Sequence, residues 1–178
     1  MDAISPLSAA QLREATPGLA ALLADAVAGG ASLGFLAPFG RDEALEWWRG
    51  RAAAVADGRL AVWAARDAEG LTGTVSLARE EKANGRHRAE VVKLMVHRRA
   101  RGRGLGRRLL GTAERAAAGG GATLLLLDTE TGSPADALYR SAGWTSYGVV
   151  PGHATDPAGV PRPTTFFFKS LTDAAHGA

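Results

Sequence analysis

Glycine and arginine alternate in one short stretch, Arg101-Gly102-Arg103-Gly104-Leu105-Gly106-Arg107, which follows an apolar run and precedes a helical pattern. Glycines at a strand-to-helix turn let backbone amides approach a ligand closely, and the helix N-terminus adds the positive end of its dipole. Such a nest of amides binds phosphate oxygens without a lysine, and nearby arginines add charge-assisted hydrogen bonds. The stretch therefore predicts a site for a coenzyme that carries several phosphates.

Positive charge is concentrated around this stretch. The net charge is only +3, yet six arginines fall within eleven residues: Arg98, Arg99, Arg101, Arg103, Arg107 and Arg108. This concentration predicts a local anionic partner. A nucleic acid is one candidate, because counterion release favours its binding to basic patches. The glycines and the apolar helical pattern favour a folded phosphate site instead, so no nucleic-acid partner is expected.

Other chemical motifs fit the chain less well. A dinucleotide-binding fingerprint needs a third glycine where the chain has Arg107, and no Gly-Lys pair is present for a nucleotide-binding P-loop. Residues 30–34 match the hydrolase pattern G-x-S-x-G, but a helical pattern precedes them, so a loop is expected there. The chain has no cysteine, and its four histidines have no ligand spacing: His87, His97, His153 and His176. Neither a metal site nor a cysteine nucleophile is predicted.

Hydrophobic periodicity predicts the elements that position these residues. Helices are expected over residues 8–28, with a break or kink at Pro17-Gly18, over 42–57, from the glycine stretch to about 118, and over 133–143. Strands are expected over 59–66, 71–80, 90–96, 123–128, 145–150 and 164–171. The first two strands form a hairpin, the 123–128 strand is buried on both faces, and a Pro/Gly-rich loop, 151–163, separates the last two. This order predicts an α/β fold with one mixed sheet and helices on both faces.

Length and composition bound the class of protein. A chain of 178 residues predicts a single domain, 1–178, that buries its own core. The absence of cysteine fits a reducing compartment, and the first fifteen residues lack the basic and apolar regions of a signal peptide. The weakly charged stretch 18–39 contains Asp25 and Pro38, which favours helix plus loop over a membrane span. A cytoplasmic protein without a membrane partner is expected.

The glycine stretch resembles the R/Q-x-x-G-x-G/A signature of GNAT acetyltransferases, in the family's strand-to-helix context. Residues 138–144, Leu-Tyr-Arg-Ser-Ala-Gly-Trp, stand where the family has L-Y-x-x-x-G-F. The resemblance implies the GNAT fold and acetyl-CoA as cosubstrate, with Leu94, Met95 and Val96 along the acetyl and pantetheine portion. It implies that the pyrophosphate is held by Arg101, Gly102, Arg103, Gly104, Leu105, Gly106 and Arg107. One departure is Gly132, where many members have an asparagine, which puts one side-chain contact to the cofactor in doubt.

The resemblance also implies catalytic residues. In the family the strand corresponding to 90–96 is bulged and splays from its neighbour, which frees an amide near Met95 for the thioester oxygen. Tyr139 matches the family tyrosine near the sulfur and is the candidate general acid, with a core tyrosine as the alternative. Glu90 and Asp128 lie on adjacent strands if the family order holds. Asp128 is the candidate direct base, with a loop-capping role as the alternative. Glu90, roughly 15 Å from the bulge, would act through water.

Residues 92–97 and 127–139 are similar to the tabtoxin-resistance subgroup of the family. This resemblance suggests acetylation of an amine or hydroxyl of a small polar molecule, such as an amino-acid-like toxin or antibiotic, by direct attack. The alternatives are a protein or peptide N-acetyltransferase and a non-catalytic acyl-CoA-binding sensor. The acceptor depends on residues 29–40 and 151–163, whose loops periodicity does not fold. The Phe166-Phe167-Phe168 run is a candidate homodimer interface.

Overall fold

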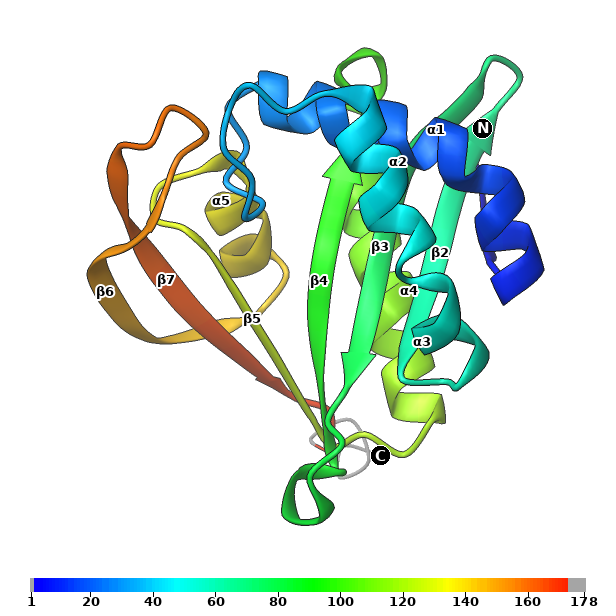
Figure 1. Ribbon diagram of the computed structural model, residues 1–178. Helices are drawn as coiled ribbons and strands as arrows, with labels where there is room; N and C mark the ends of the chain where they lie inside the picture. The colour runs from blue at the N-terminus through cyan, green and yellow to red at the C-terminus, as the bar shows by residue number, and fades with distance from the viewer. Residues whose placement is uncertain (1, 173–178) are drawn as a thin grey trace.

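Seven strands form one mixed sheet in the computed structural model, which describes residues 2–172 (Figure 1). The strands are β1 (Ala3–Pro6), β2 (Leu60–Asp67), β3 (Gly70–Arg79), β4 (Arg88–Val96), β5 (Leu124–Glu130), β6 (Thr145–Thr155) and β7 (Pro161–Ser170). Their order across the sheet is β1-β2-β3-β4-β5-β7-β6. Within the described chain β4 and β5 pair in parallel, and the other neighbours pair antiparallel.

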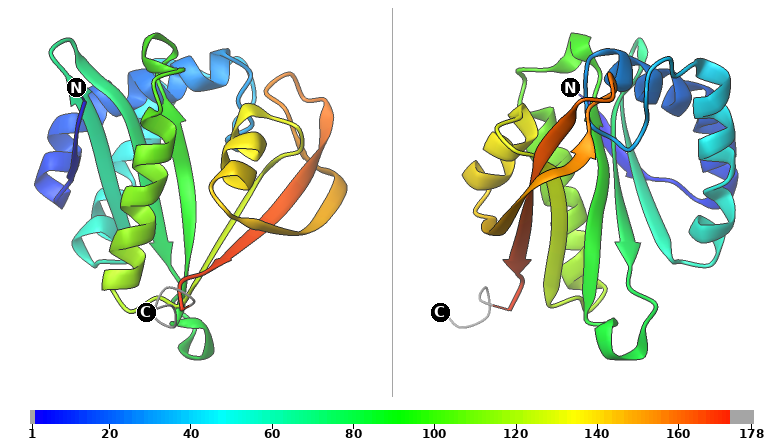
Figure 2. Two further views of the ribbon diagram at one scale, coloured as in Figure 1. Left: turned by 180° about the vertical axis from the view of Figure 1, so that it is seen from behind. Right: turned by 60° about the vertical axis from the view of Figure 1, so that its left-hand side comes forward.

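Helices cover both faces of this sheet. Three helices lie on one face: α1 (Ala9–Ala28), α2 (Arg41–Arg49) and α3 (Ala52–Ala56). On the other face lie α4 (Leu105–Gly119) and α5 (Pro134–Ser141), which Figure 2 shows from behind. Two short 3-10 turns, η1 (Ala83–Gly85) and η2 (Arg98–Ala100), flank β4. The predicted α/β fold with a mixed sheet and helices on both faces is confirmed. Across residues 2–172, none of the helices combines the length and apolarity that crossing a bilayer requires.

Each helical layer has its own core. On α4, the buried residues Leu105, Leu109 and Ala113 recur every four positions, which is the stripe expected of a helix packed on a sheet. They join residues of β2 to β5, β7 and α5 in one buried cluster. On the opposite face, leucines of α1 pack with Trp48 of α2 and with Met95 of β4. Strand β4 therefore contributes to both cores and connects the two layers.

Two helix predictions need correction. Helix α1 runs through Pro17, so of the break or kink predicted there, the break is wrong. Proline removes only the hydrogen bond to the carbonyl of Arg13, an exposed residue whose oxygen water can reach. The helix predicted over 42–57 is divided into α2 and α3, because the chain leaves regular helical geometry at Gly50-Arg51.

The C-terminal part of the sheet also differs from expectation. On β5 only Leu125 and Leu127 are fully buried, so the prediction of a strand buried on both faces is wrong. The α1–α3 layer lies over the β2–β4 half and leaves this face of β5 less covered. Strand β6 extends to Thr155, so the loop predicted over 151–163 shrinks to 156–160. Proline is tolerated there because β6 is an edge strand with a bulge between Val150 and Ala154. The short edge strand β1 was not predicted.

The Phe166-Phe167-Phe168 run contributes unequally to the fold. Phe167 is fully buried and its ring lies 5.9 Å from that of Tyr139, whereas Phe168 is only half-buried on the other face of β7. We expect Phe167→Ala to lower the free energy of unfolding by about 3–5 kcal/mol, because it leaves a cavity in the α4–α5 core. Urea unfolding measures this loss. The matched variant Phe168→Ala is expected to lose less of the free energy of unfolding. Equal losses in the two variants would contradict the assignment of Phe167 to the core.

Candidate active site

Strands β4 and β5 separate soon after they begin to pair. Their ladder joins residues 88–90 only to 124–126, and beyond Glu90 the two strands diverge (Figure 1). On the other edge of β4 the register with β3 shifts, so that Val75 faces two residues, Lys93 and Leu94. Lys93 has φ 53° and is the one non-glycine residue with positive φ in the described chain. The bulged and splayed strand is therefore present, with its bulge at residues 93–94.

A cavity of about 1050 Å³ lies in the gap between these strands. Its walls come from β4, from the end of β5, from the 29–34 segment, from the glycine stretch and from α5. The three candidate catalytic residues, Glu90, Asp128 and Tyr139, all line it. So do the residues expected along the cofactor, apart from Arg103, which is exposed beside it. The fold thus brings the residues singled out in the sequence to one place.

The glycine stretch forms the turn into α4. Gly102 and Gly104 have φ 76° and 72°, in the left-handed region, and Gly104 is the N-cap of the helix. Within residues 2–172 the amides of 102–107 donate to no acceptor, and the first turn of α4 carries no acidic side chain. Unpaired amides at a helix N-terminus form an anion site. The geometry at residues 102–107 is therefore that of a nest for phosphate oxygens.

Three of the six clustered arginines form ion pairs with carboxylates of the fold. Hydrogen bonds from Arg99 lower the pKa of Asp67 to about 2, with Nη1–Oδ2 and Nη2–Oδ1 distances of 2.6 and 3.0 Å. Two further arginines of the cluster are held by carboxylates of other elements: Arg98 by Asp25, and Arg108 by Asp2. These pairs fix the ends of α1, β1 and the β2–β3 turn around the base of the glycine stretch.

The other three arginines have no carboxylate partner within the described part of the chain. Arg101 donates from Nε to the Val96 carbonyl at 3.1 Å, and Arg107 donates to the Ser141 carbonyl at 2.8 Å. Arg103 is exposed. Each guanidinium carries five N–H donors, so most of their donors remain for an anion. The excess positive charge therefore lies around the amide nest.

Glu90 and Asp128 lie on the same face of the sheet. Glu90 pairs with Leu126 across the β4–β5 ladder, and Asp128 follows Leu126 by two residues, which returns it to that face. Partial burial in the cavity raises the pKa of Glu90, and the charge of Asp128 raises it further. The expected neighbourhood of the two carboxylates is therefore present.

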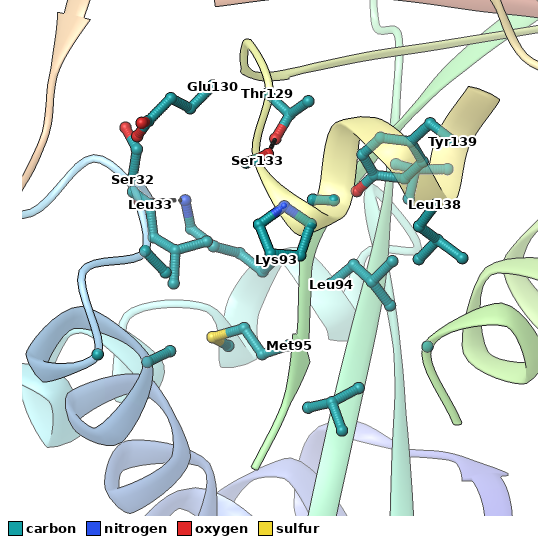
Figure 3. Close-up of a pocket in the computed structure, with 18 of the residues that line it drawn as sticks. Ser32, Leu33, Lys93, Leu94, Met95, Thr129, Glu130, Ser133, Leu138 and Tyr139 are labelled. Atoms are coloured by element: carbon teal, nitrogen blue, oxygen red, sulfur yellow. Dashed lines mark hydrogen bonds between the residues drawn. The ribbon is translucent and has the colours of Figure 1, made fainter. Parts of the chain in front are cut away.

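Tyr139 enters the cavity from the opposite face of the sheet. Its ring packs against Trp144 and Phe167, and Figure 3 shows its hydroxyl oxygen directed into the cavity. Burial raises the pKa of Tyr139, as does the charge of Asp128, so the hydroxyl keeps its proton at neutral pH. A capped turn holds α5 in place: the Gly132 amide donates to Asp136 Oδ2 at 2.8 Å. The cavity thus places a protonated hydroxyl opposite two carboxylates.

Sequence reasoning missed Lys93. Its ammonium lies inside the cavity and donates to the Leu33 carbonyl at 2.8 Å (Figure 3). It also lies near the rings of Phe35 and Trp47. Burial lowers the pKa of Lys93, and the charge of Asp128 opposes this shift. A lysine inside the apolar run 91–96 was the available signal. Within residues 2–172, no three His, Asp or Glu side chains are grouped to hold a metal ion.

Comparison with known proteins gives consistent matches. The profile of the acetyltransferase (GNAT) family matches residues 18–144. A ribosomal-protein-alanine N-acetyltransferase from Brucella melitensis is 25% identical, with a TM-score of 0.75 over 95% of this chain and 99% of that chain. A putative acetyltransferase from Salmonella typhimurium, solved with its cofactor acetyl-CoA, is 21% identical, with a TM-score of 0.76 over 100% and 97%. A putative phosphinothricin N-acetyltransferase is 18% identical, with a TM-score of 0.75 over 96% and 99%.

Proposed function

The chain belongs to the acetyltransferase (GNAT) family, whose members use acetyl-CoA, and from this premise we propose that it acetylates an amine or hydroxyl of a small polar molecule by direct attack. One observation carries the proposal. A single cavity joins the unpaired amides of 102–107 to the carboxylate of Asp128 and the hydroxyl of Tyr139. A binding module needs only the amides, whereas acyl transfer also needs a base and an acid.

The residues present fit acetyl-CoA, which supplies the acetyl thioester when bound. We assign the pyrophosphate to the amides of 102–107, with charge-assisted hydrogen bonds from Arg101, Arg103 and Arg107. Leu94, Met95 and Val96 of β4 line the stretch of the cavity between this nest and the carboxylates. Their backbone is our candidate for contacts with the pantetheine and acetyl portions.

The proton transfers follow from the two sides of the cavity. We assign Asp128 as the base that accepts the proton from the attacking amine or hydroxyl, with Glu90 acting through water. The new bond joins the acceptor nitrogen or oxygen to the acetyl carbon, and the carbon–sulfur bond breaks. Tyr139 then donates its proton to the departing sulfur and regains one from solvent. Its raised pKa keeps the hydroxyl protonated at neutral pH, so the proton is present before the step.

The size of the acceptor is suggested by the 29–40 segment, which we call the acceptor loop. Its Ser32 hydroxyl donates to the Thr155 carbonyl at 3.3 Å, and its Ala37 amide donates to the Pro157 carbonyl at 2.7 Å. The acceptor loop therefore connects the two halves of the splayed sheet across one side of the cavity. This bridge favours a small molecule, such as an amino-acid-like toxin or antibiotic, over a polypeptide that needs an open groove.

A thiol-release assay tests the proposal. The wild-type protein and acetyl-CoA are combined with free amino acids including L-phosphinothricin, with aminoglycosides, and with peptides that begin with alanine. We expect acceptor-dependent thiol release with at least one of the small molecules. Release with peptides alone would favour the protein N-acetyltransferase alternative. Calorimetric binding of acetyl-CoA without release under any condition would favour a sensor.

Tyr139→Phe tests the general acid. The variant keeps the ring that packs on Trp144 and Phe167 and removes only the hydroxyl, so folding stability is expected to change little. We expect kcat to fall by about 10²-fold, the lower end of what a positioned acid contributes. Steady-state kinetics measure kcat, and thermal unfolding checks the fold. An unchanged kcat would leave Tyr139 as a core residue.

A further inference from the structure

We propose that Lys93 is a positioning residue that fixes the acceptor loop against β4 and thereby sets the affinity for the acceptor. Its kinetic consequence rests on the proposed acetyl transfer, whereas its structural consequence does not.

The bulge decides on which face of the sheet Lys93 lies. Val91 belongs to the core under α4, so regular alternation would place residues 93 and 95 in that core as well. Instead Met95 packs in the α1–α3 core, and Leu94 packs on the α4 side. The extra residue at 93–94 has therefore reversed the alternation. It moves Lys93 out of an apolar core and onto the face where the acceptor loop lies.

The ammonium of Lys93 contacts the acceptor loop and α2. It donates to the Leu33 carbonyl at 2.8 Å and lies 5.5 Å and 5.4 Å from the ring centroids of Phe35 and Trp47. Phe35 also packs on Trp47, with centroids 5.7 Å apart, so the loop and α2 share one aromatic surround for the charge. Cation–π contacts and a hydrogen bond to a carbonyl both stabilise a partly desolvated ammonium. The left-handed φ of Lys93 costs backbone energy, which these contacts offset.

The acceptor loop also packs Ala31, Leu33, Phe35 and Phe39 on the α1–α3 core. Gly30 and Gly34 have positive φ, and residues 31–40 contain no helix or strand. Ser32 and Ala37 attach the loop to the β6–β7 turn, on the far side of the cavity. Lys93 adds a hydrogen bond from β4 to the backbone of the loop. Without it, we infer, the loop keeps its contacts with β6–β7 and with the α1–α3 core but is held less firmly against β4, and the acceptor half of the cavity widens.

Hydrogen–deuterium exchange on the free protein tests the structural consequence. Lys93→Met keeps the length of the side chain and removes its charge, and we expect amide exchange in residues 29–40 to quicken by about tenfold. Lys93→Arg can still donate to the Leu33 carbonyl, so its amide exchange in residues 29–40 is expected to stay close to that of wild type. Lys82→Met, on the exposed turn before β4, is the matched control. Unchanged exchange in 29–40, or faster exchange throughout the sheet, would overturn the proposal.

Kinetics test the consequence for the acceptor, with the panel compound that wild type turns over fastest. We expect Lys93→Met to raise the acceptor KM by about tenfold, with kcat and the calorimetric Kd for acetyl-CoA within about twofold of wild type. In Lys93→Arg we expect an acceptor KM between those of Lys93→Met and wild type. A fall in kcat without a change in acceptor KM would overturn the proposal. If wild type acetylates no panel compound, the proposed function fails, and the exchange result alone decides the role of Lys93.

Discussion

Asp128→Asn is expected to lower turnover by about 10²–10⁴-fold while acetyl-CoA still binds with nearly wild-type affinity. The amide is isosteric with the carboxylate but cannot accept the acceptor's proton. Among residues 2–172, no side chain or amide donates a hydrogen bond to the carboxylate of Asp128, and the backbone pairing of Asp128 with Phe166 does not depend on it, so this substitution breaks no contact that stabilises the fold. Thiol release measures kcat, calorimetry measures the Kd for acetyl-CoA, and thermal unfolding checks stability.

The effect is specific to Asp128 if its neighbours behave differently. Glu130 also lines the cavity, two residues further along β5, so Glu130→Gln is a matched control that we expect to keep most of the turnover. The turnover of Glu90→Gln is expected to lie between those of Asp128→Asn and Glu130→Gln, because a carboxylate acting through water contributes less than a direct base. Wild-type turnover in Asp128→Asn would show that Asp128 is not the base. A parallel loss of acetyl-CoA affinity would move Asp128 into the binding site.

Gly104→Val is expected to weaken acetyl-CoA binding by about 10²-fold or more. A side chain at φ 72° is strained, and a β-branched one most of all. At this position it also projects beside the unpaired amides of 102–107, where we place the pyrophosphate. Losing the alignment of several charge-assisted hydrogen bonds, each worth about 1.5–3 kcal/mol, accounts for this magnitude. Calorimetry with acetyl-CoA and with CoA measures the loss.

Gly58 provides the matched control for this variant. It has φ 73°, and a Cβ added there meets nothing within 4 Å, as at Gly104. Gly58 follows α3 and does not line the cavity. Gly58→Val therefore has a similar backbone strain, and we expect a similar loss of thermal stability with unchanged acetyl-CoA affinity. Equal affinities in both variants would place the pyrophosphate elsewhere.

The cofactor half of the site was accessible from the sequence because it is local. The spacing of Gly102, Gly104 and Gly106 defines a turn and a helix start within one short segment, and periodicity places strand 90–96 directly before it. The order of helices and strands was likewise predictable, since each element carries its own pattern. Local geometry and a family signature therefore predicted the turn and its unpaired amides, and the phosphate-binding role of residues 101–107 stays a prediction. The catalytic roles of Glu90, Asp128 and Tyr139 stay predictions.

The acceptor half was not accessible because it depends on contacts distant in sequence. The bulge that reverses the alternation of β4 leaves no mark in the apolar run 91–96, so Lys93 could not be assigned to a face. The end of β6 was hidden because Pro151 and Gly152 signal a loop, although β6 is an edge strand and tolerates a proline. The partial exposure of β5 follows from the layer above it and not from its four leucines.

The division of the arginine cluster has a consequence for the first encounter with a ligand. Three of its charges are neutralised by carboxylates, and three remain around one opening of the cavity. A field of this kind acts over roughly the Debye length, about 8 Å at physiological ionic strength, and steers polyanions toward the opening before any contact forms. The arginines that we assign to the coenzyme are thus also expected to accelerate its capture from solution, and dissolved salt is expected to weaken this attraction at long range.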